Sequence, residues 1–317
     1  MSLVLVAVVI AVLPWVVGKY FVALALLVGI YVIATTGLTL LMGFAGQVSL
    51  AQAAFYGIGA YASTILTTRL GVPVWLGMVI APVVAALVAW IIGGPSLRLH
   101  GHYLALATLA FGIIVFIVFL EAPALTGGPS GTIGIPRLRL GPWTLTQDRE
   151  YYHVVWAVAL AVTWGARRLV GSSYGRLLRA LAASESGAAA MGVDAHALKL
   201  RMFVLSAALG ALAGALYAHW ITVISPSAFG FEVSIEFVVM VVVGGVASAW
   251  GPLLGVIVVT ALVEILRSAM PTFRPGAAAE FEVLAFGLLL IVVMVFLPEG
   301  LAGLPRHRGE RTHARTV

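Results

Sequence analysis

Cysteine is absent from this chain, and charged residues are scarce. Without a thiol, the chain cannot form disulfides, thiolate zinc sites, iron–sulfur clusters or a cysteine nucleophile. Asp, Glu, Lys and Arg make up 9% of the 317 residues, against roughly 25% in a soluble domain. So few charges cannot give a globular protein a polar surface. The composition therefore argues against a water-soluble enzyme, a disordered chain and a coiled coil.

Lysine occurs only at positions 19 and 199, so the sequence contains no phosphate-binding P-loop. That motif requires Gly-Lys-Ser/Thr after a glycine-rich turn, and Lys19 precedes Tyr20. If ATP drives a process that involves this chain, another polypeptide must hydrolyse it. One nucleophile-like pattern, Gly-Ser-Ser-Tyr-Gly at 171–175, follows a hydrophobic segment. We interpret it as a polar loop, because the motif needs a strand-to-helix turn. The scattered histidines predict no metal site.

Hydrophobic residues make up 62% of the chain, and the mean hydropathy is +1.10. This apolar surplus must face lipid, which predicts an all-α, polytopic membrane protein. A spanning helix needs about 20 apolar residues. We predict about ten spans in one membrane domain, residues 1–300, and a basic tail, residues 301–317. The spans are expected at 3–17, 20–42, 48–68, 73–92, 103–120, 153–170, 202–221, 235–249, 251–269 and 281–297.

Basic residues gather between the sixth and seventh spans and in the C-terminal tail. Ten of the 18 lie there: Arg167, Arg168, Arg176, Arg179, Lys199, Arg201, Arg306, Arg308, Arg311 and Arg315. Cytoplasmic loops are rich in Lys and Arg, so both places are expected in the cytoplasm. Counting spans then puts the N-terminus inside as well, and residues 121–152 outside. We interpret the net charge of +6 as this topological signal, not as a sign of nucleic-acid binding.

Polar residues inside predicted spans are costly and need a partner or a use. On a helix, Ser49, Gln52, Tyr56, Gly59 and Ser63 recur at spacings of three and four and form one stripe. Such a stripe lines a translocation path or packs in a helix–helix seam, and the sequence leaves both interpretations open. The candidates for the path are Gln47, Ser49, Gln52, Tyr56, Ser63, Glu236 and Glu264.

Glycines and carboxylates add three further expectations for the spans. Gly43 and Gly46 can break the backbone before the stripe, which is tolerated only inside protein or along a cavity. Residues 206–217 carry a second stripe with a Gly-x-x-x-Gly pair, a pattern typical of helix packing. Glu236 and Glu264 each serve a path or lie buried against a neighbour, and Arg267 is a candidate neighbour of Glu264.

Segment 171–201 is the longest predicted cytoplasmic loop. Ser184 is a suitable N-cap, Glu185 suits the first turn of a helix, and Gly192 is a natural stop. These signals predict a short helix of about two turns between two spans. It either rests on the chain itself or offers its small residues to another protein.

This loop resembles the coupling loop of ATP-binding-cassette (ABC) importer permeases, because a glycine-centred helix follows a Ser-x-x-Gly-Arg start. The string from Gly43 to Tyr61, GFAGQVSLAQAAFYGIGAY, resembles the first signature of branched-chain amino-acid permeases of the LivM type. Further similar motifs follow in the family's order: LRLHGHY at 97–103, TLAFG at 108–112, LTGG at 125–128, Ser206-Ala207, Ser225-Pro226, Gly244-Gly245, Gly251-Pro252 and Glu264.

The resemblance implies a transport subunit without its own ATPase, not an enzyme. It would pair with a homologous second permease, two cytoplasmic ABC ATPases and an extracytoplasmic binding protein, in a bacterial or archaeal cytoplasmic membrane. ATP and magnesium would be used by the ATPases, with no cofactor on this chain. The coupling candidates are Arg176, Arg179, Ser184, Glu185 and Gly192. Family members usually carry charges just before this helix, where this chain has Ala182-Ala183-Ser184.

The implied substrate is a branched-chain or other hydrophobic amino acid. Related permeases carry urea, short amides or other amino acids, so these stay alternatives. From the residues alone, an ion-coupled secondary transporter competes with the ABC importer, and the family resemblance favours the importer.

Overall fold

The computed structural model describes residues 3–99, 101–140, 143–145, 147–269, 287 and 300–303. The tenth predicted span, 281–297, and the tail beyond residue 303 lie outside this set, apart from residue 287. Within the described residues the chain is helical, with four very short strands at one end. The predicted helical membrane protein is confirmed, whereas the count of ten spans stays a prediction.

The first nine predicted spans each coincide with helical structure among the described residues. The helices are α1 Leu3–Val16, α2 Lys19–Thr39 continued by the π-helix η1 Leu40–Phe44, α3 Gln52–Thr68, α4 Val74–Ser96, α5 His102–Glu121, α7 Asp148–Gly171, α10 Ala195–Ile221, α11 Phe231–Gly244 and α12 Gly251–Ala269. Six segments are long and apolar enough to cross a membrane: 19–44, 74–96, 102–121, 148–171, 195–221 and 226–244. The other three helices, α1, α3 and α12, have 14, 17 and 19 residues.

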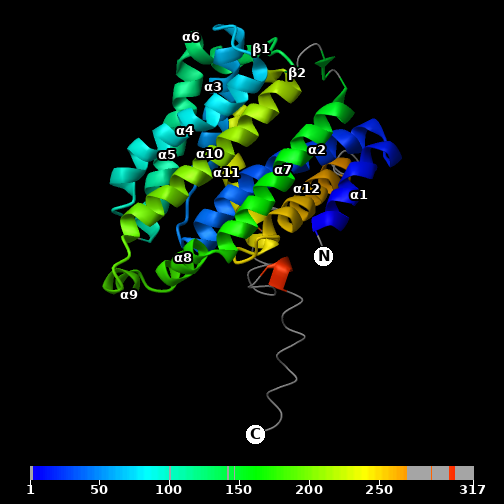
Figure 1. Ribbon diagram of the computed structural model, residues 1–317. Coiled ribbons are helices and arrows are strands. Elements are labelled where there is room, and N and C mark those ends of the chain that lie inside the picture. Colours follow the sequence, from blue (N-terminus) through cyan, green and yellow to red (C-terminus); the bar gives the residue numbers. More distant parts are fainter. Residues whose placement is uncertain are drawn as a thin grey trace.

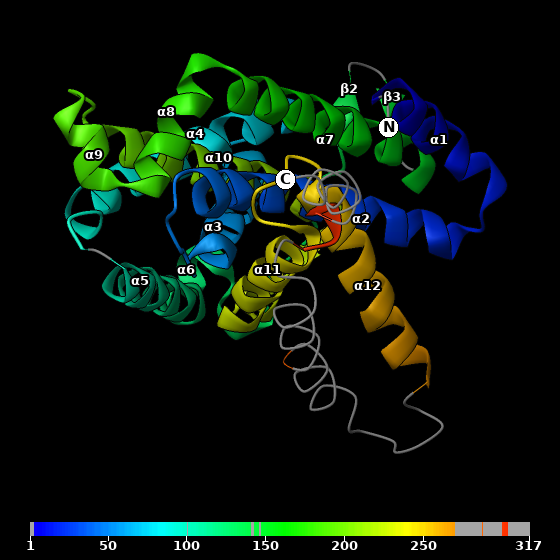
Figure 2. The same cartoon turned by 90° about the horizontal axis from the view of Figure 1, so that it is seen from below.

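Helix α10 lies at the centre of the bundle and packs on α2, α3 and α4 (Figures 1 and 2). Glycines permit this close approach. A Cβ added to Gly214 of α10 would lie 1.8 Å from the backbone oxygen of Tyr56 on α3. One added to Gly59 of α3 would lie 2.1 Å from the backbone oxygen of Ala211. The Gly-x-x-x-Gly pair of α10 therefore serves helix packing, as its pattern predicts.

One end of the bundle carries two further helices, α8 Ser173–Ala183 and α9 Glu185–Ala190, and the 3₁₀ turn η5 Leu301–Gly303 (Figure 1). The expected loop 171–201 is thus mostly helical, and the seventh span begins at Ala195 instead of 202. The expectation of a polar loop at 171–175 was wrong, because α8 begins at Ser173. Its apolar residues Leu178 and Leu181 are buried against the bundle, so tertiary packing stabilises this helix.

The opposite end is closed by a cap built from residues 122–140, 143–145 and 222–230. It contains α6 Pro123–Thr126, η2 Gly128–Ser130, η3 Pro226–Phe229 and two antiparallel pairs of two-residue strands. The strand β1 Thr132–Ile133 pairs with β4 Val223–Ile224, and β2 Arg139–Leu140 pairs with β3 Trp143–Thr144. The first pair joins the segment before α7 to the segment after α10. We refer to this end as the strand cap.

Candidate functional site

The backbone is broken between α2 and α3. Helix α2 widens into the π-helix η1, the chain leaves helical geometry at Ala45, and Gly46 takes a left-handed φ of +66°. The amide of Gln47 bonds back to the carbonyl of Leu41 at 3.1 Å. π-helical turns occur frequently at functional sites. The predicted break at Gly46 is confirmed, and it delays the start of the third helix from residue 48 to Gln52.

This broken segment, residues 45–51, is covered by protein on one side, whereas Gly46 and Val48 are exposed. Irregular backbone at membrane depth is tolerated only where it is buried in protein or lines a cavity. Its residues Ala45, Gln47, Ser49 and Ala51 are buried. The amide of Leu50 donates to the Thr108 hydroxyl of α5 at 3.0 Å. Gly43, just before the break, touches the turn after α11: an added Cβ would lie 1.8 Å from the backbone oxygen of Val246. Discontinuous helices of this kind form substrate sites in many transporters.

Gln52 joins three helices. Its Nε2 donates to the carbonyl of Ala34 on α2 at 2.9 Å and to the carbonyl of Ser206 on α10 at 3.3 Å. Its Oε1 accepts the Ser206 hydroxyl at 3.1 Å. Gly210 leaves room for the amide, since an added Cβ would lie 2.9 Å from Nε2. The side chain is 1% exposed. This geometry places Gln52 in a helix–helix seam.

Tyr56 lies one turn further along α3, in a buried cluster of aromatic rings. Ring centroids of Phe229, Tyr217 and Phe237 lie 5.4, 5.6 and 5.7 Å from its own. Its hydroxyl is buried and finds no hydrogen-bond partner among the described residues. Glu236, half-buried, precedes Phe237 on α11. Sequence reasoning selected Tyr56 and Glu236 separately, and the structure brings their helices together around this cluster.

Ser63 belongs to a buried hydrogen-bonded chain that sequence reasoning missed. Its hydroxyl lies 2.8 Å from Nε2 of His219, and Nδ1 of the same imidazole lies 2.7 Å from the carbonyl of Pro136. Because a carbonyl only accepts, Nδ1 carries a proton and donates to Pro136, and in the neutral imidazole Nε2 then accepts from Ser63. The chain ties α3 and α10 to the strand cap. An ionisable side chain inside the predicted span 202–221 was the available signal.

Two further path candidates, Glu264 and Ser49, have hydrogen-bond partners of their own. The hydroxyl of Tyr20 donates to Glu264, so this carboxylate joins α12 to the start of α2. The side chain of Arg267, its candidate partner, lies outside the described residues. Ser49 is buried, and its hydroxyl accepts the amide of Ala51 at 3.4 Å. The position of Glu264 inside a predicted span is therefore explained by its hydrogen bond to Tyr20 on a neighbouring helix.

Gln47 lies beside a polar cavity of about 360 Å³ that also reaches the loop helices. Both atoms of its amide are buried and find no partner within the described part of the chain. The same cavity is lined by Ser184, Glu185 and Lys199. An unpartnered buried amide costs about 1–3 kcal/mol. Like the Tyr56 hydroxyl, the Gln47 amide is thus a polar group of a path candidate that has no partner among the described residues.

The short helix α9 has the capping that the sequence predicts. The Ser184 hydroxyl accepts the amide of Gly187 at 3.1 Å, and Gly192 follows the helix with φ +81°. Glu185 forms an ion pair with Lys199 at the start of α10. Before it, Arg176 donates to the Ser173 hydroxyl at 2.8 Å. The ion pair with Lys199 holds α9 in place against α10.

The loop helices also touch the broken segment. Arg179 donates to the carbonyl of Val170 at 3.1 Å and fastens α8 to the end of α7. A Cβ added to Gly46 would lie 3.4 Å from the Cβ of Ala182, the second-last residue of α8. A displacement of α8 and α9 would therefore reach the helix break directly.

These features define a class: a polytopic helical membrane protein with a broken helix inside the bundle and a capped helical loop at one end. A family model described as "Branched-chain amino acid transport system / permease component" matches residues 20–294. The chain belongs to this family of permease components. The match begins with α2 and leaves α1 outside.

Relatives in two organisms support the assignment. The chain is 32% identical to the high-affinity branched-chain amino acid transport system permease protein LivM of Escherichia coli, over 92% of this chain and 72% of the relative. It is 28% identical to LivH of the same organism, over 87% and 92% of the two chains. A probable LivM permease of Methanocaldococcus jannaschii is 26% identical, over 71% and 68%. No solved structure matches the chain at a significant level.

Proposed function

We propose that this chain carries branched-chain or other hydrophobic amino acids across a bacterial or archaeal cytoplasmic membrane. It acts as the permease of an ABC importer, driven by ATP hydrolysed on partner subunits. The observation that carries the proposal is the family match over residues 20–294, which includes the broken helix and the capped loop helix. The names of its relatives supply the amino-acid class.

Two observations support α8 and α9 as the proposed ATPase docking site. The outer surface around α9 is open: Met191 is 83% exposed, and a Cβ added to Gly192 would meet nothing within 4 Å. The inner surface is fastened to α10 through the Glu185–Lys199 ion pair. An ATPase that moves α9 would move Ala182 against Gly46 and so change the helix break. Arg176, Arg179 and Ser184 hold the loop helices in shape.

The proposed orientation places α8, α9 and both termini in the cytoplasm and the strand cap outside. A binding protein would deliver substrate to the cap. A homologous permease would complete the path. This proposal is supported by the similarity of the chain to both LivM and LivH, two permease proteins of one organism. Gln47, Ser49 and Tyr56 are the proposed polar points of the path on this chain, and Gln52, Ser63, Glu236 and Glu264 are its further candidates. The chain itself binds no cofactor, and ATP with magnesium stays on the ATPases.

The first test is co-purification of the tagged chain from native membranes in mild detergent, followed by mass spectrometry. We expect an ABC ATPase and a second permease. In vesicles whose interior faces α9, the assembled complex should then import radiolabelled leucine only when ATP is enclosed inside. Uptake by this chain alone that an ionophore dissipates would refute the importer and favour the ion-coupled transporter. Uptake of urea or short amides in preference to leucine would refute the substrate.

A further inference from the structure

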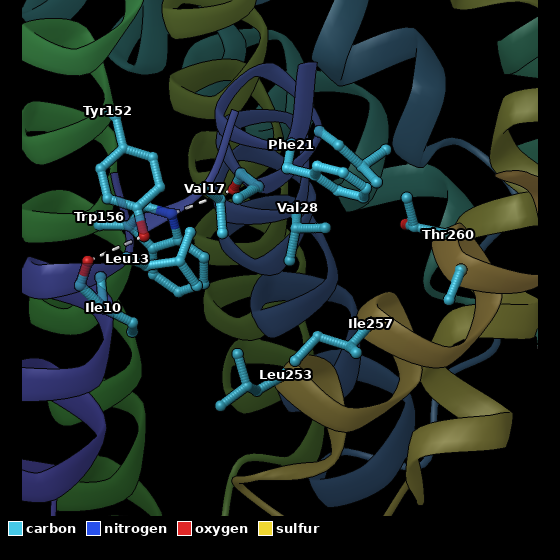
Figure 3. A pocket seen from close by; sticks show the side chains of 13 residues that line it. Ile10, Leu13, Val17, Phe21, Val28, Tyr152, Trp156, Leu253, Ile257 and Thr260 are labelled. Atoms are coloured by element: carbon cyan, nitrogen blue, oxygen red, sulfur yellow. Dashed lines mark hydrogen bonds between the residues drawn. The ribbon is translucent and has the colours of Figure 1, made fainter. Parts of the chain in front are cut away.

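An apolar cavity of about 450 Å³ lies between α1, α2, α7 and α12 (Figure 3). Its walls include Leu13 of α1, Phe21 and Val28 of α2, and Trp156 of α7. Helix α12 adds Leu253 and Ile257. Interiors of folded proteins are close-packed and leave few voids larger than a water molecule. A space of this size between four helices therefore calls for an occupant.

The lining offers water almost nothing to bind. The hydroxyl of Tyr152 donates to the carbonyl of Ile10, and Nε1 of Trp156 donates to the carbonyl of Ala25, both at 3.0 Å (Figure 3). Both polar groups are thus satisfied by backbone. The buried hydroxyl of Thr260 is the remaining polar side-chain group of the lining. Because apolar cavities stay dry, the occupant must itself be apolar.

The cavity opens to the lipid and is too small for a helix. Two lining residues, Phe21 and Ile257, are 58% and 45% exposed, so the space reaches the outer surface of the bundle. A helix about 10 Å wide with a rise of 1.5 Å per residue fills about 120 Å³ per residue. The cavity would therefore hold roughly one helical turn of a partner, whereas a flexible chain of methylenes can follow its shape.

Positive charge lies at one end of the same helices. Lys19 begins α2, and Arg149 lies in the first turn of α7, with its guanidinium 5.9 Å from the ring of Trp15 on α1. Both line a polar pocket with Arg137 and Asp148, which lie 4.0 Å apart as an ion pair. Glu150 lies beside them in the first turn of α7, so this end of the helices carries three basic groups and two acidic groups. Aromatic and basic side chains together are typical of the membrane interface.

We propose that this cavity binds a membrane phospholipid, with an acyl chain between α1 and α12 and the phosphate at Lys19 and Arg149. The wall formed by α1 lies outside residues 20–294, which the permease family shares. The lipid would fill the space that α1 leaves against the family core and fasten α1 to it. The inference requires only the membrane location, so it is independent of the transported substrate.

The test is photolabelling of the full chain in vesicles of phosphatidylcholine and phosphatidylglycerol. A trace phospholipid carries a diazirine in the middle of its acyl chain, and labelled peptides are mapped by mass spectrometry. We expect labelling of α1 and α12 that saturates with probe and is competed by unlabelled phosphatidylglycerol. Labelling of all lipid-facing helices that rises linearly with probe would overturn the proposal, without the need for any variant.

Matched variants then locate the two parts of the lipid. Thr260→Trp fills the cavity and should abolish the saturable label, while Val83→Trp, on the 64% exposed face of α4, should preserve it. Unchanged labelling in Thr260→Trp would overturn the acyl-chain site. Lys19→Gln combined with Arg149→Gln should keep the label but remove the preference for phosphatidylglycerol over phosphatidylcholine as competitor. A preference that survives this pair would overturn the phosphate assignment.

Discussion

Replacing Gln52 by leucine tests whether this side chain holds three helices together or lines the transport path. The substitution keeps the volume similar but removes three hydrogen bonds, two to backbone carbonyls of α2 and α10 and one from the Ser206 hydroxyl. A hydrogen bond between membrane helices contributes about 0.6 kcal/mol on average and about 1.7 kcal/mol at most. The three bonds therefore predict a loss of about 2 kcal/mol in unfolding free energy.

A double-mutant cycle with Ser206→Ala separates the energy of the Gln52–Ser206 side-chain bond from that of the other bonds of Gln52. Because Gln52 and Ser206 bond directly at 3.1 Å, the two substitutions should be non-additive by about 0.6–1.7 kcal/mol. The freed Ser206 hydroxyl in Gln52→Leu can bond back to a carbonyl of its own helix, which limits the cost. Unfolding of the purified chain in mixed micelles, followed by tryptophan fluorescence, measures each free energy.

The seam interpretation requires that stability and transport fall together in Gln52→Leu. A variant as stable as wild type, with additive energies but with uptake lost in the reconstituted complex, would refute the reasoning. That result would move Gln52 from the helix seam to the transport path.

Three further predictions follow from single contacts. Gly214→Ala should lower the unfolding free energy by about 1–3 kcal/mol, because the added Cβ would overlap a backbone oxygen of α3. The control Gly94→Ala, with open space around it, should not destabilise the protein, and equal effects of the two substitutions would contradict the packing argument. Gly192→Trp should prevent ATPase co-purification, while Gly192→Asn, which tolerates the left-handed φ, should retain it; normal co-purification of the Trp variant would exclude docking there. His219→Phe should lower the unfolding free energy by about 1–3 kcal/mol and expose the strand cap to protease, because the Ser63 hydroxyl and the Pro136 carbonyl lose their partner. Unchanged cleavage by protease would show that other contacts hold the cap.

The sequence was most informative where one local property decides the structure. Long apolar runs have one stable form in lipid, the helix, because every backbone group must be hydrogen-bonded within the segment. The helices that coincide with the first nine predicted spans therefore begin and end within a few residues of the prediction at most boundaries. The cap of α9 at Ser184 and the stop at Gly192 were also readable, because they depend on neighbours within a few residues.

The predictions failed where contacts between residues far apart in the sequence determine the structure. The segment 173–183 is short, and it forms a helix because Leu178 and Leu181 are buried against the bundle. The expected loop there was therefore wrong. His219 was overlooked because its meaning arises from Ser63 and Pro136, 156 and 83 residues away.

The sequence by itself determined the membrane class, the family and the set of polar residues that need an explanation. Only the tertiary structure decided which of them are satisfied by neighbours, as Gln52 and Glu264 are, and which are left without a partner in the described chain, as Gln47 and Tyr56 are. It also revealed the cavity behind α1. The physical reason is that hydrophobic run length and capping are local properties, whereas hydrogen-bond satisfaction and packing depend on which helices meet.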